Sequence, residues 1–153
     1  MSLMTSLNIS ATGMSAQRTR MDIIAQNVAN VNTTRTEDGG AYRRQTVVFS
    51  ERAIHNKNFE DYLTAQKTGL SYNPQIGSGV KISSIVEDHV SAMKKVYEPS
   101  NPDADEEGYV TYPNVNTVTE MTNLIDASRS YEANVTAFNA TKNMALKGLE
   151  LGK

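Results

Sequence analysis

Acidic side chains at alternate positions make the segment that begins at Asp103 the nearest approach to a metal-binding motif in this chain. Asp103, Asp105 and Glu107 are spaced like the first carboxylates of a calcium loop, and Gly108 follows where such loops turn sharply. The position of the bidentate glutamate is occupied by Asn114, and prolines upstream preclude an entering helix. The match is therefore incomplete, and an acidic turn leading into a strand explains the same residues.

Other reactive residue types occur without the partners that catalysis requires. The two histidines, His55 and His89, are far apart and have no metal-ligand spacing. The chain contains no Cys, which excludes disulfides, thiolate metal sites and cysteine nucleophiles. Nucleophile motifs and phosphate-binding glycine loops are absent as well. We therefore expect no catalytic residues, no metal site, no cofactor and no enzymatic activity.

Two adjacent cations, Arg43 and Arg44, precede a strand-like run. Nucleic-acid binding would require a wider basic face with interleaved aromatic residues. The net charge of −2 also provides no overall attraction to polyanions. We interpret the pair as the solvent-exposed start of a strand or as one side of a salt bridge to a neighbouring subunit.

Acidic residues are concentrated in one part of the chain. Residues 96–128 contain seven Asp or Glu and no Lys or Arg. A solvated acidic loop explains this bias, and a docking patch for a basic neighbour is the alternative.

Membrane segments and cleaved targeting signals are not expected. No run approaches the ~20 apolar residues that span a bilayer. Residues 1–15 lack a basic n-region, and polar residues interrupt any apolar core. We therefore predict no direct membrane span and no cleaved signal peptide.

Apolar side chains recur with helical spacing at both ends of the chain. Steps of three and four residues keep such side chains on one face of a long helix, and that face requires a partner. The stripe near the amino end consists of Leu3, Leu7, Ser10, Met14, Gln17, Met21, Ile24, Val28 and Val31. The stripe near the carboxyl end consists of Val118, Met121, Ile125, Tyr131, Val135, Phe138, Leu146 and Leu149. We predict a helical hairpin over 3–31 and 117–149 whose stripes form an assembly seam with other chains.

Short polar residues mark one end of each helix. Thr117 and Glu120 have the spacing of a capping box, in which each side chain bonds to the backbone amide of the other. Asn27, Asn30 and Asn32 crowd the end of the first helix, where amide side chains can satisfy freed backbone groups. A helix terminus explains these asparagines, and a specific hydrogen-bonding contact is the alternative.

Between the helices the sequence predicts a small β-rich part, so the fold class is α+β. Strands are expected over 42–49, 80–86, 90–97 and 109–112, where β-branched and aromatic residues concentrate. Glycines and Pro74 interrupt residues 53–78, which carry no recognisable motif and are interpreted as a variable loop.

Three segments together resemble the axial proteins of the bacterial flagellum, the family of rod and hook subunits. Residues 25–33 look like the Asn-rich signature that ends the first helix of these proteins. Residues 96–110 resemble a segment specific to a proximal-rod member, and residues 113–134 are similar to the approach and first half of its last helix. The motif residues are Asn27, Asn30, Asn32, Pro99, Pro102, Gly108, Tyr109, Pro113 and Asn114.

The resemblance implies a fold and a division of the chain. Two terminal helices would pack as a coiled coil or helical bundle, with a small β-rich domain outside. The N-terminal core helix would occupy 1–33, the β-rich outer domain 34–114 and the C-terminal core helix 115–153.

The resemblance also implies a structural role. The protein would be a subunit of the periplasmic rod of the basal body, which carries torque from the rotor to the hook. Family members leave the cell through the flagellar type III export apparatus, unfolded and uncleaved. The implied partners are further copies of the chain itself, other proximal and distal rod proteins, the adaptor that links the rod to the membrane ring, and the export apparatus.

Two alternatives remain at this point. One is a different rod or hook-type member of the same family, against which residues 99–110 and the short middle part argue. The other is a calcium-binding or enzymatic module on a helical hairpin.

Overall fold

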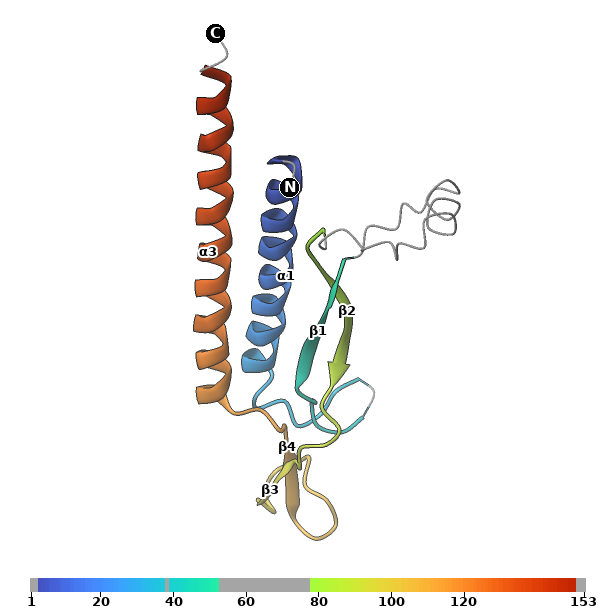
Figure 1. Cartoon of the computed structure of the whole chain (residues 1–153). Coiled ribbons are helices and arrows are strands. Elements are labelled where there is room, and N and C mark those ends of the chain that lie inside the picture. The colour runs from blue at the N-terminus through green and yellow to red at the C-terminus, as the bar shows by residue number, and fades with distance from the viewer. Residues whose placement is uncertain (1–2, 38, 53–77, 151–153) are drawn as a thin grey trace, which may run out of the picture.

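Two long antiparallel helices, α1 (Leu3–Ala29) and α3 (Thr117–Glu150), define the long axis of the molecule. The computed structural model describes residues 3–37, 39–52 and 78–150. A hairpin of β1 (Gln45–Glu51) and β2 (Val80–Glu87) lies along the side of α1 that is turned away from α3 (Figure 1). The chain is therefore α+β, with helices at both ends and antiparallel strands between them, as predicted.

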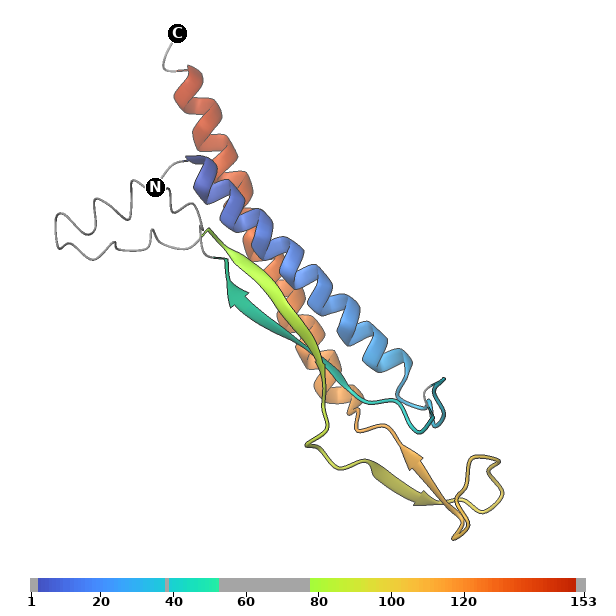
Figure 2. The same ribbon diagram turned by 90° about the vertical axis from the view of Figure 1, so that its right-hand side faces the viewer.

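A second ribbon, formed by β3 (Lys94–Tyr97) and β4 (Tyr109–Tyr112), lies beyond the paired helix ends (Figure 2). The β-rich part thus comprises two separate two-stranded antiparallel sheets. In the β1–β2 hairpin, Gln45 pairs with Glu87 and Glu51 with Val80, with a bulge between Val48 and Phe49.

Small residues set the spacing between α1 and α3. Ala16 on α1 and Ala127 on α3 are both buried. At Gly13 a Cβ atom would lie 2.7 Å from Oδ1 of Asn134, so a side chain there would force Asn134 to move. Small side chains at these positions let the two helices approach closely.

The β1–β2 hairpin is attached to α1 through a close backbone approach. Gly79, just before β2, has φ = +114°, and a Cβ atom there would collide with the Thr12 hydroxyl. That hydroxyl accepts a 3.2 Å hydrogen bond from the Val80 amide. Gly79 is therefore required both by its backbone conformation and by the contact.

Two predicted strand starts are wrong, and two strands end slightly later than predicted, β1 at Glu51 and β2 at Glu87. β1 begins at Gln45 rather than Tyr42, and β3 begins at Lys94 rather than at residue 90. The delay in β3 follows from a turn in which Oδ1 of Asp88 accepts 2.9 Å hydrogen bonds from the amides of Val90 and Ser91. β4 has the predicted bounds, and α1 ends two residues before the predicted residue 31.

Some expectations concern residues outside the described ranges. Residues 53–77, nearly all of the predicted variable loop 53–78, and His55 within it belong to this group. Of the helices described, neither has a stretch of the length and apolarity that a membrane crossing requires.

Candidate functional site: a buried polar junction and an exposed helix face

The side chain of Asn27 connects α1 to the start of β1 and to the first turn of α3. Asn27 is fully buried, and its Nδ2 donates to the Gln45 carbonyl at 2.8 Å and to Oε2 of Glu120 at 3.0 Å. Its Oδ1 accepts hydrogen bonds of 2.9 Å from the Tyr42 hydroxyl and from the Gln45 amide. The side-chain amide thus uses both of its N–H donors and both acceptor positions of its oxygen. Asn27 therefore forms a specific contact between elements and does not cap the end of the helix.

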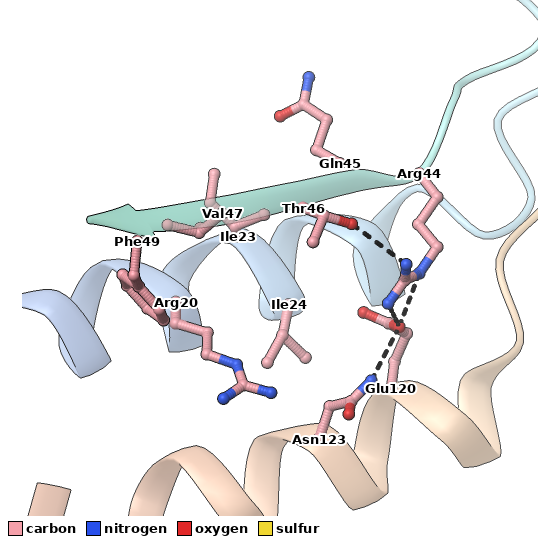
Figure 3. Close-up of a pocket in the computed structure, with 10 residues that line it drawn as sticks. All are labelled: Arg20, Ile23, Ile24, Arg44, Gln45, Thr46, Val47, Phe49, Glu120 and Asn123. Carbon is pink, nitrogen blue, oxygen red and sulfur yellow. Dashed lines mark hydrogen bonds and ion pairs between the residues drawn. The ribbon is translucent and has the colours of Figure 1, made fainter. Parts of the chain in front are cut away.

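The carboxylate of Glu120 is the buried charge at the centre of this contact. Glu120 has no exposed surface, whereas the Arg44 side chain is 26% exposed. Oε1 accepts from Nε of Arg44 at 2.9 Å and from Nη2 at 2.8 Å (Figure 3). Nη1 of Arg44 also donates to the Thr46 hydroxyl at 3.1 Å. We call Asn27, Tyr42, Arg44 and Glu120 the polar junction.

The polar junction overturns the predicted capping box. Asn116 caps α3 instead, because its Oδ1 accepts from the amides of Val118 at 3.0 Å and Thr119 at 3.3 Å. The Glu120 amide is bonded to the Asn116 carbonyl at 2.9 Å. The Glu120 carboxylate is directed to Arg44 and Asn27, since a buried charge is best paired with a cation and further donors.

Arg44 directly precedes β1, as expected for a strand start, but it is half-buried rather than solvent-exposed, and its ion pair is not with a neighbouring subunit. Arg44 pairs with Glu120 of its own chain, 76 residues away. Its backbone amide donates to Oδ1 of Asn114 at 2.9 Å, and Nδ2 of Asn114 donates to the Asp88 carbonyl at 3.0 Å. Asn114 therefore links the segment before α3 to the start of β1 and the end of β2.

Burial also affects the ionisation of the junction. The pKa of Tyr42 is raised above its ordinary value of 10.0, mainly by burial and further by the negative charges of Glu87 and Glu120. A neutral tyrosine is thereby favoured, and it is the neutral hydroxyl that donates to Asn27.

The other motif residues have mostly local roles. Asn30 donates from Nδ2 to the Gln26 carbonyl at 2.9 Å, which fits a helix terminus. Gly108 has φ = +82°, and a Cβ atom there would lie 2.9 Å from the Tyr97 ring. Tyr97 and Tyr109 form an edge-to-face pair with centroids 5.3 Å apart. The remaining members are exposed (Asn32, Pro99 and Pro102) or buried (Pro113).

The acidic segment forms a turn that leads into β4. Oδ1 of Asp105 accepts from the amides of Glu107 at 3.1 Å and Tyr109 at 2.8 Å. Oδ2 of Asp103 accepts from the Thr34 hydroxyl at 2.7 Å. Within residues 3–37, 39–52 and 78–150, no three acidic or histidine side chains are grouped as a metal ion would require. The geometry agrees with the acidic-turn interpretation.

The predicted seam residues lie in two different environments. On α1, Ile24 is buried, Leu7, Met14, Met21 and Val28 are half-buried, and Leu3 is exposed. On α3, Tyr131, Val135 and Phe138 are half-buried, whereas Val118, Met121, Ile125, Leu146 and Leu149 are exposed. The exposed fractions of Val118, Met121 and Ile125 are 72%, 56% and 53%. The apolar stripe of α3 is therefore largely not the face that packs on α1.

An open groove continues this exposed stripe between the two helices. Met21 of α1 lines it together with Leu124, Ile125, Ser128, Arg129 and Glu132 of α3. We call Val118, Met121, Leu124 and Ile125 the outer helix face. This face and the groove beside Met21 form an apolar surface on the hairpin of helices.

Comparison with known proteins gives consistent matches along the chain. A family model described as "Flagella basal body rod protein" matches residues 7–35, and one described as "Flagellar basal body rod FlgEFG protein C-terminal" matches residues 106–151. The flagellar basal-body rod protein FlgC of Bacillus subtilis is 45% identical over 152 residues, covering 97% of both chains. That of Borreliella burgdorferi is 43% identical, covering 99% of this chain and 98% of the relative, and that of Salmonella typhimurium is 39% identical over the full length of both.

The helical hairpin at the chain ends and the matches to both of its helices define a flagellar basal-body rod protein. Such a protein is a structural subunit of the rod. Because relatives at 39–45% identity are matched over nearly their whole length, the chain belongs to the FlgC family.

Sequence reasoning identified the two helices and the family but missed the polar junction. For Asn27 the sequence pattern leaves a specific contact open as an alternative. For Tyr42, Arg44 and Glu120 it predicts other roles. No local spacing connects these residues, since Asn27 and Glu120 are 93 positions apart. The available signal was a polar residue inside an apolar helix face, which marks a buried group without naming its partner.

Proposed function

We propose that this chain is a torque-carrying subunit of the proximal rod in the periplasm, where its terminal helices pack against those of neighbouring subunits. The observation that carries the proposal is the exposure of large apolar side chains on the outer helix face. Burying a side chain of this size contributes about 1.5–3 kcal/mol. Four such residues on one face of α3 favour a further helix that packs against them.

The proposed partner helix would bind in the groove beside Met21. A third helix laid between α1 and α3 would contact Met21, Leu124 and Ile125 and would complete a helical bundle. Under this proposal residues 1–33 and 115–153 form the bundle, and residues 34–114 form the outer part. The seam residues Leu7, Met14 and Val28 would be covered in the same way.

Stiffness is the property that a drive shaft requires. The polar junction supports it because Asn27 and Glu120 hold α1, the start of β1 and the first turn of α3 at fixed distances. Many apolar contacts over long helices would spread the load between subunits, whereas a single surface ion pair contributes little.

The proposal includes partners and a route of delivery. Partners are further copies of the chain, other proximal and distal rod proteins, and the adaptor between rod and membrane ring. Delivery is by the type III export apparatus in an unfolded form without cleavage. In the single chain α3 exposes much of its apolar surface, which favours folding at the assembly site over folding before export.

The substitution Ile125→Asp tests the outer helix face. It should abolish rod assembly and motility, because an aspartate cannot be buried without a partner, while the free energy of unfolding of the monomer changes by less than about 1 kcal/mol. The measurements are electron microscopy of isolated basal bodies and urea unfolding of the purified chain.

The matched control is Thr119→Asp, at an exposed position of α3 that lies on a different side of the helix from Val118 and Ile125 and does not line the groove. This variant should assemble. Assembly by Ile125→Asp, or an equal defect in both variants, would contradict the proposed role of this face.

A further inference from the structure

A second pocket opens on the other side of α1, between α1, β1 and α3 (Figure 3). Its apolar walls include Ile23 and Ile24 of α1 and Val47 and Phe49 of β1. The Arg44–Glu120 ion pair lies at one end, and Arg20 projects into the space from α1. We call this the Arg20 pocket.

The Arg20 pocket has an unbalanced positive charge. Arg44 and Glu120 neutralise each other, whereas the Arg20 side chain forms no ion pair and no hydrogen bond with any other residue of the described ranges. Arg20 is half-buried, so its charge is partly removed from water. A guanidinium in this setting favours a carboxylate, and the apolar walls favour a carboxylate carried beside an apolar or aromatic group.

Such a combination is present at the β3–β4 tip, the loop that connects Tyr97 to Tyr109. Glu106 and Glu107 are exposed there, and their carboxylates form no hydrogen bond or ion pair with other described residues. The two tyrosines beside them are 63% and 40% exposed. The lysines of β3, Lys94 and Lys95, lie at the opposite end of the ribbon, because Lys94 pairs with Tyr112 and Tyr97 with Tyr109.

We propose that the β3–β4 tip of one copy docks in the Arg20 pocket of the next copy. Glu106 or Glu107 would pair with Arg20, and the ring of Tyr97 or Tyr109 would cover Phe49. This inference rests on the proposed function, because it assumes that copies of the chain meet in the rod.

The positions of the two surfaces determine what kind of contact this is. The tip lies beyond the paired helix ends, whereas Arg20 lies well inside α1, so the two do not meet within one chain (Figures 1 and 2). A contact between two different surfaces of identical subunits is heterologous. Repeated without closure, it produces a helical array, which is the form of a rod.

Charge exchange tests the pairing. Arg20→Glu, and separately Glu106→Lys with Glu107→Lys, should each lower the yield of complete rods by about tenfold or more, and the combined variant should restore most of it. Arg18→Glu is the matched control, since Arg18 is exposed on the same helix outside the pocket, and it should have little effect. Failure of the combined variant to recover, with each single variant folded by circular dichroism, would overturn the inference.

Cross-linking separates this inference from the proposed function. Because the chain contains no Cys, Arg20→Cys and Glu106→Cys in one chain create the only two thiols. A short bismaleimide should join them between copies in isolated basal bodies but not in dilute monomer. Basal bodies that contain the chain without this cross-link would refute the inference alone, whereas basal bodies from wild-type cells that lack the chain would refute the proposed function. A cross-link from position 20 to a different rod protein would also refute the inference.

Discussion

Among single residues, Glu120 is the buried carboxylate of the chain's polar junction, and three side chains contact it: Arg44, Asn27 and, at 3.4 Å, Asn123. Glu120 receives an ion pair from Arg44 and a hydrogen bond from Asn27, which lie on either side of the loop between α1 and β1. Removing one partner of a buried pair is costly because the other charge remains buried without compensation. The polar junction should therefore respond strongly to single substitutions and less to matched double substitutions.

Arg44→Ala should destabilise the chain by about 3–5 kcal/mol, because it leaves the Glu120 carboxylate buried without a cation. Adding Glu120→Gln should recover part of that loss, since a neutral amide is cheaper to bury. Urea unfolding measures both variants. Arg43→Ala is the control, because Arg43 forms no ion pair within the described ranges, and an equal loss there would refute the special role of Arg44.

Tyr42 predicts a response to alkaline pH. Its pKa is raised in the folded chain, so below its ordinary pKa of 10.0 the hydroxyl is protonated in both states and its contribution to stability is complete. As the pH rises further, the unfolded chain loses this proton first and the folded state is weakened. Between about pH 9 and 11, the midpoint temperature of thermal unfolding should fall more steeply with pH for wild type than for Tyr42→Phe. Parallel curves would contradict this prediction.

At the scale of elements, the structure depends on how closely α1 is approached from both sides. Gly13 permits contact with Asn134 of α3, and Gly79 permits contact of the β1–β2 hairpin with Thr12. α1 is thus held between two layers, with Ile23, Ile24 and Asn27 among its buried residues. A side chain at either glycine has no space without movement of a neighbour.

Gly79→Ala should detach the hairpin from α1. Positive φ and the collision with Thr12 act together at this position, for an expected loss of about 2–4 kcal/mol. Gly39→Ala is the matched control, because Gly39 has φ = +84° with nothing within 4 Å of its Cβ position, and it should cost only about 1 kcal/mol. Hydrogen exchange of the β1 and β2 amides would locate the effect. Similar losses in both variants would show that the contact with Thr12 contributes nothing.

At the scale of the whole molecule, α3 extends past α1. The pairs Gly13–Asn134 and Asn27–Glu120 keep one antiparallel register, which places Leu3 opposite Met144. The last turn of α3 therefore lies beyond the first turn of α1, and Leu146 and Leu149 are 50% and 72% exposed. Elongated shape and uncovered helix ends are properties expected of a subunit that is completed by its neighbours.

Hydrogen exchange should detect whether neighbouring subunits cover the exposed end of α3. In dilute monomer the amides of Leu146–Glu150 should exchange rapidly and proteases should trim this end, whereas the amides around Ala127 should be protected. In the assembled rod the same terminal amides should become protected. Equal protection of both regions in dilute monomer would mean that α3 needs no partner.

The features that depend on local pattern follow from the order of the residues alone. Spacing of three and four residues predicted both helices, and the Tyr-Val-Thr-Tyr run predicted β4 with its observed bounds. The Asn-rich end of α1, the segment around Pro99 and the approach to α3 indicated the family that the comparisons then showed. These features could be read because each depends on neighbours within a few residues along the chain.

Which surfaces meet depends on contacts between residues that are distant in the sequence and come together in the folded chain. α3 packs on α1 around Ala127 and Asn134, where Gly13 allows a close approach, whereas Val118, Met121 and Ile125 of its apolar stripe stay exposed. Glu120 had the spacing of a capping residue, but Arg44 and Asn27 recruited its carboxylate from positions 76 and 93 residues away. Local pattern cannot select among such partners, because the free energy of a buried polar group depends on which donors the folded chain places beside it.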